Sequence, residues 1–380
     1  MTDIVVYGAT GLVGRTVCHE LDAAGAAFAI VGRSAERIDA LGAELPAATR
    51  RIAMISEPPT LQRAFGGARV VVNCTGPVSE TGEPILVAAL AAGAHYIDLG
   101  GDQAFMHAAL ERHESTARRA GLVAMPGAAL NCAIGDWAAA WAAQHVCGIA
   151  RSEIDGDVVR HEPAPTLAEA QPFDDVSVSY IYDDLVLSPA GQRAVFASVQ
   201  QRGLAWRRDR WEAVAPASER RRINAGLAMG GERDVTSFPG GEVITIPRHL
   251  ATRAVQTFVS TTRHKFAGAA LRLLARAMPL IPKHATALLV PYTPKDHEYE
   301  RTRFAIVAQV RRGFEAAQIV VGGGDQYLTS AVIAAWVARH LAARTSGPTG
   351  MRAPSELFRP APALREIAVA AELTLEPSFA

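Results

Sequence analysis

The stretch Ile4–Gly14, which reads IVVYGATGLVG, decides the fold of the N-terminal part of the chain. A short β-branched run ends at Gly8, and Gly8, Gly11 and Gly14 then recur at every third position. The pattern predicts a strand, a tight turn and a helix, where backbone N–H groups and the helix N-terminus can approach a pyrophosphate. The predicted dinucleotide contacts in this turn are Gly8, Ala9, Thr10, Gly11, Leu12, Val13 and Gly14.

The end of the second apolar run indicates which dinucleotide the site takes. Phe28–Val31 is followed by Gly-Arg-Ser, and positions 32–35 hold no carboxylate. An NAD site places an acidic residue there, ~20 residues after the glycines, to bind a ribose 2′-hydroxyl. A guanidinium instead matches a 2′-phosphate in charge and in the fork of its donors. We therefore predict NADP(H), contacted by Arg33, Ser34 and Arg37, unless Arg33 is an ordinary solvated arginine.

Composition and charge exclude several classes of protein. The chain has 380 residues, enough for two domains. Its 38 basic and 38 acidic residues balance, so a dedicated nucleic-acid binder is excluded. The four cysteines have no metal-ligand spacing, and we expect no metal site. Because we find no signal sequence and no uninterrupted apolar run of ~18 residues, we expect a cytoplasmic protein without membrane insertion.

Residues 1–130 alternate strand-like and helical stretches, as a doubly wound parallel sheet does. We expect the third strand at Ile52–Ile55, the fourth at Val70–Asn73 and the fifth at His95–Leu99. Ligands of such sheets bind beyond the carboxyl ends of the strands, so the turns there should line one rim. Further predicted cofactor contacts on this rim are Ser56 after the third strand and Cys74, Thr75, Gly76 and Pro77 after the fourth.

The segment Val71–Asp102 resembles the saccharopine dehydrogenase-like oxidoreductases. It contains Cys-Thr-Gly-Pro, then Gly-Glu-Pro, then Ala-Gly-Ala-His-Tyr-Ile-Asp, and Gly240–Arg253 is similar to a later family stretch. The resemblance is dense over the first third of the chain and thinner afterwards. It implies a two-domain NAD(P)H reductase with a Rossmann domain and a mixed-sheet substrate domain. The family includes saccharopine reductases and trans-acting enoyl reductases, so the substrate stays open.

The middle of the chain predicts a second domain. Strand-like runs cluster here instead of alternating with helices, at Val176–Tyr182, at Val243–Ile246 and as a pair within 309–321. We expect an α/β fold with an N-terminal Rossmann doubly wound parallel sheet and an inserted α+β substrate domain with a mixed sheet. The expected boundaries are 1–130 for the Rossmann domain, completed by 325–380, and 131–324 for the substrate and dimerisation domain. Prolines make the C-terminal tail poor in predicted helix before Leu364.

Polar residues after the fifth and sixth strands are the candidate catalytic groups. Asp98 and Asp102 flank a Gly-Gly turn and can orient an amine or iminium, or relay a proton. The alternatives are a helix cap for Asp98 and a solvated carboxylate for Asp102. Asn131 follows the sixth strand at the expected hinge, where a substrate cleft forms. His95 and Tyr96 alternate on a strand, and we interpret both as core residues.

Two further features bear on the substrate. The arginines within 207–210 and 220–222 can bind carboxylates of an amino-acid adduct, or form a solvated helix face balanced by Glu212 and Glu219. The apolar stretch Phe266–Pro291 can wall a substrate pocket, form a subunit interface or pack in the core.

Together these patterns predict an NADPH-dependent reductase. The leading interpretation is hydride transfer to an imine of an amino-acid and oxo-acid adduct, as in saccharopine reductases. The alternative is a trans-acting reductase of enoyl groups on a polyketide or lipid chain. An interpretation from another class is a regulator that binds NADPH without turnover. The expected partner is a small-molecule substrate, and the expected assembly is a homodimer.

Overall fold

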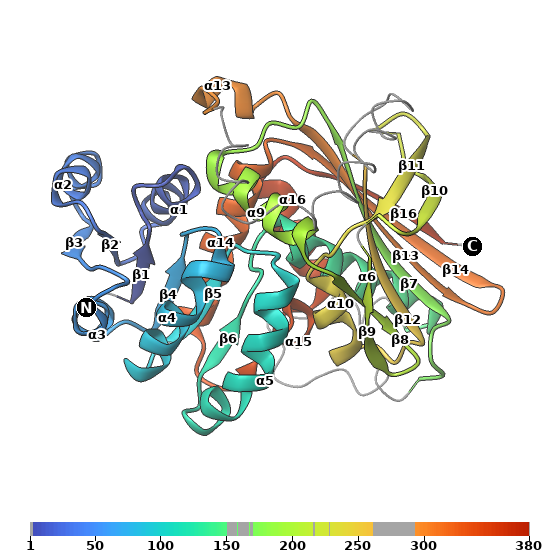
Figure 1. Ribbon diagram of the computed structural model, residues 1–380, viewed down its shortest axis with the longest axis horizontal. Coiled ribbons are helices and arrows are strands. Elements are labelled where there is room, and N and C mark those ends of the chain that lie inside the picture. The colour runs from blue at the N-terminus through green and yellow to red at the C-terminus, as the bar shows by residue number, and fades with distance from the viewer. Residues whose placement is uncertain are drawn as a thin grey trace. The chain divides into compact units, whose positions relative to one another are not determined.

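The computed structural model describes residues 3–149, 158, 167, 170–215, 217–227, 229–260 and 293–379, which form two compact units (Figure 1). Unit 1 comprises Met1–Gly101, Phe105–Asn131 and Tyr327–Arg352. Unit 2 comprises Asp102–Ala104, Cys132–Gln326 and Ala353–Ala380. The predicted pocket wall or interface at Phe266–Pro291 lies outside the described residues.

Unit 1 contains a parallel sheet of seven strands in the order β15-β6-β5-β4-β1-β2-β3 (Figure 1). The strands are β1 (Ile4–Tyr7), β2 (Phe28–Gly32), β3 (Thr49–Ile52), β4 (Val70–Asn73), β5 (His95–Asp98), β6 (Val123–Met125) and β15 (Gly350–Met351). The helices are α1 (Leu12–Ala23), α2 (Ala35–Glu44), α3 (Pro58–Phe65), α4 (Val78–Ala91), α5 (Gln103–Arg119) and α14 (Gln326–Ala343). Strand and helix alternate along β1 to β6, which confirms the predicted doubly wound Rossmann sheet.

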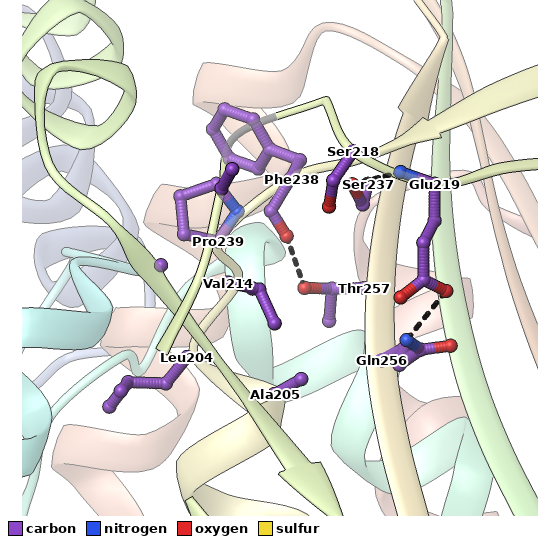
Figure 2. A pocket seen from close by; sticks show the side chains of 12 residues that line it. Leu204, Ala205, Val214, Ser218, Glu219, Ser237, Phe238, Pro239, Gln256 and Thr257 are labelled. Atoms are coloured by element: carbon purple, nitrogen blue, oxygen red, sulfur yellow. Dashed lines mark hydrogen bonds between the residues drawn. The ribbon is translucent and has the colours of Figure 1, made fainter. Parts of the chain in front are cut away.

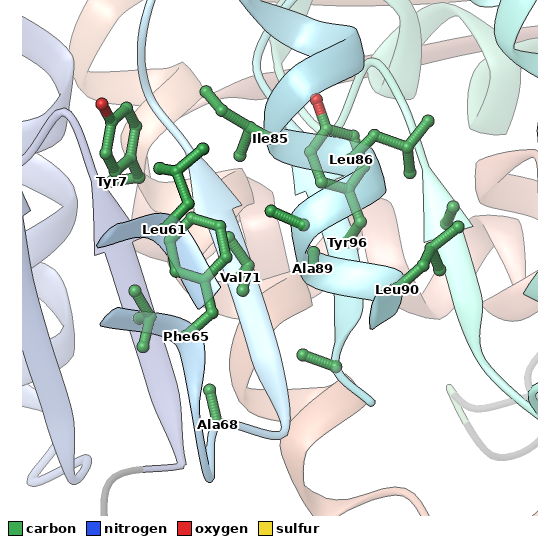
Figure 3. Close-up of a cluster of buried hydrophobic side chains, with 14 of the residues drawn as sticks. Tyr7, Leu61, Phe65, Ala68, Val71, Ile85, Leu86, Ala89, Leu90 and Tyr96 are labelled. Atoms are coloured by element: carbon green, nitrogen blue, oxygen red, sulfur yellow. The ribbon is translucent and has the colours of Figure 1, made fainter. Parts of the chain in front are cut away.

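One face of this sheet is covered by α3, α4 and α5 (Figure 3). The buried cluster on this face includes Val5, Tyr7, Val71 and Tyr96 from the strands and Leu61, Phe65, Ile85, Leu86 and Phe105 from the helices. Successive side chains of a strand face opposite sides, so Val6 and Val72 point to the other face, and they are buried as well. Burial on both faces explains why these strands read as continuous apolar runs.

The expected third strand at Ile52–Ile55 is wrong by three residues, because β3 ends where that run begins. β3 reads TRRI and lies at the edge of the described sheet, paired with β2. Its arginines are held by carbonyl oxygens, Arg50 at 2.7 Å from that of Gly42 and Arg51 at 2.5 Å from that of Ala64. Edge strands commonly carry charged side chains, so this one does not read as an apolar run.

Unit 2 is built on a mixed sheet of nine strands among the described residues. Its main order is β10-β11-β12-β7-β13-β14-β16, with β8 paired to β12 and β9 to β8. The strands are β7 (Asp175–Asp183), β8 (Gly203–Arg207), β9 (Arg210–Val214), β10 (Arg220–Asn224), β11 (Glu232–Ser237), β12 (Ala254–Ser260), β13 (Arg303–Arg312), β14 (Glu315–Gly324) and β16 (Thr374–Phe379). β7 and β12 run parallel and the other paired strands antiparallel, which confirms the predicted mixed sheet.

Helices cover one side of this second sheet. α6 (Gly135–Val146) packs on β13 and β14, and both α15 (Pro354–Leu357) and α16 (Pro360–Ala370) pack on α6. A π-helical turn, η1 (Leu130–Ile134), leads directly into α6. The remaining described helices of the unit are α9 (Pro189–Gln200), α10 (Glu242–Thr245), the 3₁₀ turn η2 (Ile246–Arg248) and α13 (Asp296–Tyr299). No helix of the described residues combines the length and the hydropathy that a membrane span needs.

Two expectations for the later part of the chain are wrong. The predicted strand at Val243–Ile246 is helical, in α10 and η2, because its burial in tertiary contacts outweighs the β propensity of its branched side chains. The tail is richer in helix than expected. Pro354 and Pro360 stand in the first turns of α15 and α16, where the missing N–H costs nothing.

The C-terminal segment divides between the units, whereas the expected boundaries join all of 325–380 to the first domain. Tyr327–Arg352 clusters with unit 1 and Ala353–Ala380 with unit 2. The reason is β16, which pairs antiparallel with β14. β16 contains Pro377, and a proline is a sequence signal against a strand. It is tolerated here because β16 is the edge strand of the sheet among the described residues.

Candidate functional site

The turn between β1 and α1 brings the backbones of Gly8 and Gly14 into contact. Gly8 has φ of +83°, a left-handed conformation that favours glycine. A Cβ atom on Gly14 would lie 2.2 Å from the Gly8 carbonyl oxygen. A Cβ atom on Gly8 would lie 2.8 Å from Cγ2 of Thr75, in the turn after β4. The glycine spacing therefore leaves a space in the turn 8–14, here called the glycine cradle. A side chain at Gly8 or Gly14 would fill it.

Helix α1 presents open backbone donors at this cradle. Its N-cap residue, Gly11, supplies no side-chain acceptor, and its first turn holds no acidic residue. The first N–H groups of a helix have no intrahelical acceptor and carry partial positive charge. Within the described residues, this helix end therefore suits an anion such as a pyrophosphate.

The three predicted contacts after β2 occupy different positions. Arg33 is exposed at the strand end. The Ser34 hydroxyl oxygen accepts the N–H of Arg37 at 3.3 Å and so caps α2. The Arg37 guanidinium donates to the Thr10 carbonyl at 2.7 Å, and thus braces the glycine turn. Of these three residues, Arg33 is the exposed cation to which the described residues give no hydrogen bond, whereas Arg37 is bound to Thr10.

The turn after β4 is anchored by a buried amide. Asn73 is fully buried, and its Oδ1 accepts the N–H of Thr75 at 3.0 Å and the hydroxyl of Thr75 at 2.6 Å. The bond between Gly76 and Pro77 is cis, and Thr75 is partly exposed. Ser56, predicted as a contact after β3, is exposed in the turn that follows that strand. All these positions follow the carboxyl ends of the strands of one sheet.

Asp98 organises two neighbouring turns. Its Oδ1 accepts the N–H of Gly100 at 2.9 Å and the N–H of Gly127 at 3.1 Å. Its carbonyl oxygen accepts the N–H of Ala128 at 2.7 Å. The side chain has no exposed area. Its contacts tie the two turns together and do not cap the next helix, and its predicted catalytic role stays a prediction.

Asn131 is exposed at the start of the π-helical turn that follows β6. Its neighbour Cys132 has φ of +132°, which residues with a side chain rarely adopt. Strained backbone and π-helical turns occur often at functional sites. A Cβ atom on Gly101 would lie 2.8 Å from the Asn131 carbonyl oxygen, so the turns after β5 and β6 touch here.

Asp102 is partly exposed and lies beside a firmly held residue. The side chain of Gln103 donates to the carbonyl oxygens of Leu204 at 3.0 Å and Gly240 at 3.1 Å. The same side chain accepts the N–H of Leu204 at 2.6 Å. The backbone at Asp102 is therefore fixed to strand β8 of unit 2.

The arginine cluster lies on strands β8 to β10, so the expected helix face is wrong. Its balance by acidic residues is confirmed. The ion pairs are Arg207–Glu219, Arg210–Glu212 at 2.9 Å, Arg220–Asp234 at 3.5 Å, Arg221–Asp175 at 2.7 Å and Arg222–Asp234 at 3.3 Å. Cations paired in this way are poor candidates for binding substrate carboxylates.

A small pocket lies beside this cluster, between β8, β9 and β12 (Figure 2). Its polar side is satisfied internally, because Gln256 donates to Glu219 at 2.8 Å and Thr257 donates to the Phe238 carbonyl at 2.5 Å. Its volume is about 20 Å³, room for about one water molecule. The pocket is too small to hold a substrate. The described residues also contain no group of His, Cys, Asp and Glu side chains that could hold a metal ion.

Unit 2 holds a buried polar cluster that the sequence analysis missed. The Tyr180 hydroxyl donates to Glu242, and both side chains are buried. Burial raises the pKa of Glu242 to about 7. Burial alone would raise the pKa of Asp136 as well. The ion pair with His249 at 2.9 Å outweighs burial and brings the pKa of Asp136 below its ordinary value. The sequence does contain one sign of this cluster: Glu242 follows two glycines within the stretch Gly240–Arg253.

Residues 4–125 match the family described as the saccharopine dehydrogenase NADP binding domain. The predicted resemblance to the saccharopine dehydrogenase-like oxidoreductases is confirmed, and so is NADP(H) as the cofactor. The match spans β1 to β6, which carry the glycine cradle and the turns described above.

Two relatives are similar over this NADP-binding domain. The chain is 38% identical over 125 residues to a Mycobacterium tuberculosis (strain ATCC 25618 / H37Rv) protein provisionally named a trans-acting enoyl reductase. It is 34% identical over 125 residues to a trans-acting enoyl reductase of Mycobacterium leprae (strain TN). Each match covers 31% of this chain and 30% of the relative, so the chain matches less than a third of each relative's length.

One solved structure is similar along the whole chain. The apo histidine-tagged saccharopine dehydrogenase (L-Glu forming) from Saccharomyces cerevisiae has a TM-score of 0.63 and covers 100% of both chains. The sequence identity is 12%, so this likeness shows the fold alone. It confirms the α/β class with a second, mixed-sheet domain.

Proposed function

We propose that the protein is an NADPH-dependent reductase. The observation that carries the proposal is the cradle at the N-terminus of α1, where Gly14 packs against the Gly8 carbonyl. The family match of the NADP-binding domain supports it. The bound cofactor supplies the hydride, and the residues of the chain bind, orient and exclude water.

The rim of the parallel sheet offers a contact for each part of the cofactor. We assign the pyrophosphate to the backbone donors of 12–14 and the 2′-phosphate to Arg33. The turn at Thr75–Pro77 is assigned to the nicotinamide riboside half, and the exposed Ser56 to the adenosine half. Ser34 and Arg37 support this arrangement through the α2 cap and the glycine turn.

The observations favour an enoyl group as the substrate over an imine. An imine of an amino acid and an oxo acid carries carboxylates, which bind best to unpaired arginines. Five of the six arginines considered for this purpose are ion-paired, such as Arg207 with Glu219, and the sixth, Arg208, lies in the exposed turn between β8 and β9. The named relatives are enoyl reductases. The likeness in fold to a saccharopine dehydrogenase keeps imine reduction as a second candidate.

We assign Asn131 and Asp102 to the substrate, because both are accessible and follow strand ends of the sheet. In this proposal Asn131 donates to a carbonyl of the substrate, and Asp102 holds or passes a proton. Asp98 acts through the backbone of the Gly100 and Gly127 turns.

An assay of NADPH oxidation with matched substrates tests the function. We expect the protein to reduce a simple enoyl thioester, and Asn131→Ala to lower kcat about tenfold or more through the lost hydrogen bond to the substrate. Turnover of an oxo acid with a primary amine, and not of the thioester, would support the imine instead. Stoichiometric NADPH binding without turnover of either substrate would support a regulator.

Replacement of Arg33 tests the choice of cofactor. Arg33→Ala is expected to weaken NADPH binding about 10- to 100-fold, because a charge-assisted contact to the 2′-phosphate is lost. NADH, which lacks this phosphate, should bind to the variant as to the wild type. Arg63→Ala is the matched control, since Arg63 is exposed in the last turn of α3, which leads to the amino end of β4 and not to the rim at the carboxyl ends of the strands. Equal losses for both cofactors would mean that the 2′-phosphate is bound elsewhere.

The expected homodimer and the cytoplasmic location stay predictions. Light scattering of the purified protein at micromolar concentration measures the first, and fractionation of the source cells the second.

A further inference from the structure

A chain of buried hydrogen bonds runs beneath the turn after β4. Thr75 donates to Oδ1 of Asn73, and Nδ2 of Asn73 donates to the Tyr96 hydroxyl at 3.2 Å. Asn73, Tyr96 and Asp98 have no exposed area; Asn73 and Asp98 pair at the ends of the adjacent strands β4 and β5, and Tyr96 lies two residues before Asp98. Figure 3 shows the Tyr96 ring within the core cluster, with its hydroxyl at one end.

The direction of every bond in this chain follows from one fixed donor. The backbone N–H of Thr75 can only donate, and it points at Oδ1 of Asn73 at 3.0 Å. The NH₂ group of Asn73 must then face Tyr96, so the Tyr96 oxygen accepts. The carboxylate of Asp98, which accepts the N–H groups of Gly100 and Gly127, lies near the Tyr96 hydroxyl. Burial raises the pKa of Tyr96 well above its ordinary value, and the nearby Asp98 raises it further, which keeps the hydroxyl proton in place.

The same logic fixes what Thr75 offers to a ligand. Its hydroxyl proton is committed to Asn73 at 2.6 Å, so its remaining capacity is that of an acceptor. Its methyl group lies against Gly8, where a Cβ atom would come within 2.8 Å of Cγ2. Among the residues that the structure describes, no donor reaches the Thr75 oxygen, and the residue is partly exposed.

We propose that Thr75 accepts a hydrogen bond from a donor on the nicotinamide riboside half of the cofactor, and that Asn73 and Tyr96 are positioning residues that fix this polarity. The proposal rests on the proposed function. Two groups of the cofactor have the required chemistry, a ribose hydroxyl and the NH₂ of the carboxamide. The carbonyl oxygen of the carboxamide is excluded as the partner of Thr75, because two acceptors do not bond.

Calorimetric titration with NADP⁺ tests the role of Thr75. Thr75→Val keeps the shape and the methyl contact with Gly8 but removes the acceptor, and it is expected to weaken binding about 3- to 10-fold. Thr75→Ser keeps the acceptor and should bind within about twofold of the wild type. Equal binding by Thr75→Val and the wild type would overturn the proposal. So would a loss in Thr75→Ser as large as that in Thr75→Val.

An analogue of NADP⁺ with an acetyl group in place of the carboxamide identifies the donor. If Thr75 binds the NH₂ group, the wild type binds the analogue more weakly than NADP⁺. The wild type and Thr75→Val then bind the analogue equally. If Thr75 binds a ribose hydroxyl, Thr75→Val weakens NADP⁺ and the analogue by the same factor. Both results support an acceptor at Thr75. Tighter binding of NADP⁺ to Thr75→Val than to the wild type would contradict it.

Tyr96→Phe tests the positioning role. The variant keeps the buried ring but removes the acceptor of the Asn73 NH₂ group, so the amide is held by Thr75 alone and the effect of Thr75→Val should shrink in the Tyr96→Phe background. The KM for NADPH should rise with little change in kcat. A lowered midpoint of thermal unfolding with an unchanged KM would show a merely structural role. Failure of the wild type to bind NADP⁺ would overturn the proposed function itself, whereas normal binding with an inert Thr75→Val overturns this inference alone.

Discussion

Gly14→Ala is expected to weaken NADPH binding about 100-fold, the largest effect of any single methyl group on this rim. The added carbon would lie 2.2 Å from the Gly8 carbonyl oxygen and 3.1 Å from Cα of Ala9, so the backbone of the cradle must shift. Backbone atoms cannot move aside as a flexible side chain does. The shift would displace the first N–H groups of α1, which are assigned to the pyrophosphate.

Fluorescence titration with NADPH measures this loss, with Gly66→Ala as the matched control. Gly66 follows α3 with φ of −55°, and a Cβ atom there would lie 3.5 Å from the Arg63 carbonyl oxygen, an ordinary van der Waals contact. The control should fold and bind NADPH as the wild type does. Circular dichroism of both variants separates lost binding from lost folding. Wild-type affinity in a folded Gly14→Ala protein would contradict the assignment of the cradle.

Stability is expected to fall as the pH rises from about 4.5 through about 7, because Glu242 is buried. Burial raises its pKa from 4.5 to about 7, so the folded protein keeps a proton that the unfolded chain releases. The stabilisation is fully present below the unfolded pKa and is lost as the pH passes the folded value. A shift of this size corresponds to about 3 kcal/mol in the free energy of unfolding.

The groups facing Glu242 do not reverse this expectation. Tyr180 donates to it, and the negative charge of Asp136 on α6 raises its pKa further. A Cβ atom on Gly135 would lie 2.3 Å from Oε1 of Glu242, so no space is left there for a solvating water.

Denaturant unfolding at pH 5 and pH 8 measures the effect. Glu242→Gln keeps the shape without a titrating group, so its stability should change less between the two pH values than that of the wild type. Glu232→Gln is the control, since the Glu232 side chain is 72% exposed and should leave the pH dependence unaltered. The same pH dependence in Glu242→Gln and the wild type would refute the account of this cluster.

The N-terminal half of the site could be predicted because its signals are local. Gly8, Gly11 and Gly14 lie within seven positions of one another, and the strand before them is apolar on both faces. The absence of a carboxylate near Arg33 needs no knowledge of tertiary structure. The turn at Thr75 could be found because strand ends of a parallel sheet share one rim.

The supporting residues could not be predicted, because they act through partners distant in sequence. Asn73 and Tyr96 read as strand residues, and their pairing depends on the register of β4 and β5. Glu242 meets Tyr180 across 62 positions of sequence. Asp98 reads as a candidate acid, and its two backbone donors become visible only when the turns after β5 and β6 are side by side.

The central claim is that the rim of the parallel sheet binds NADPH and distinguishes it from NADH by a contact with its 2′-phosphate. Calorimetric titration of the wild-type protein with NADPH and, separately, with NADH tests it most directly. The account predicts one site per chain, with NADPH bound at least about tenfold more tightly than NADH through the contact of Arg33. No heat of binding with NADPH, or equal affinity for the two cofactors, would contradict it.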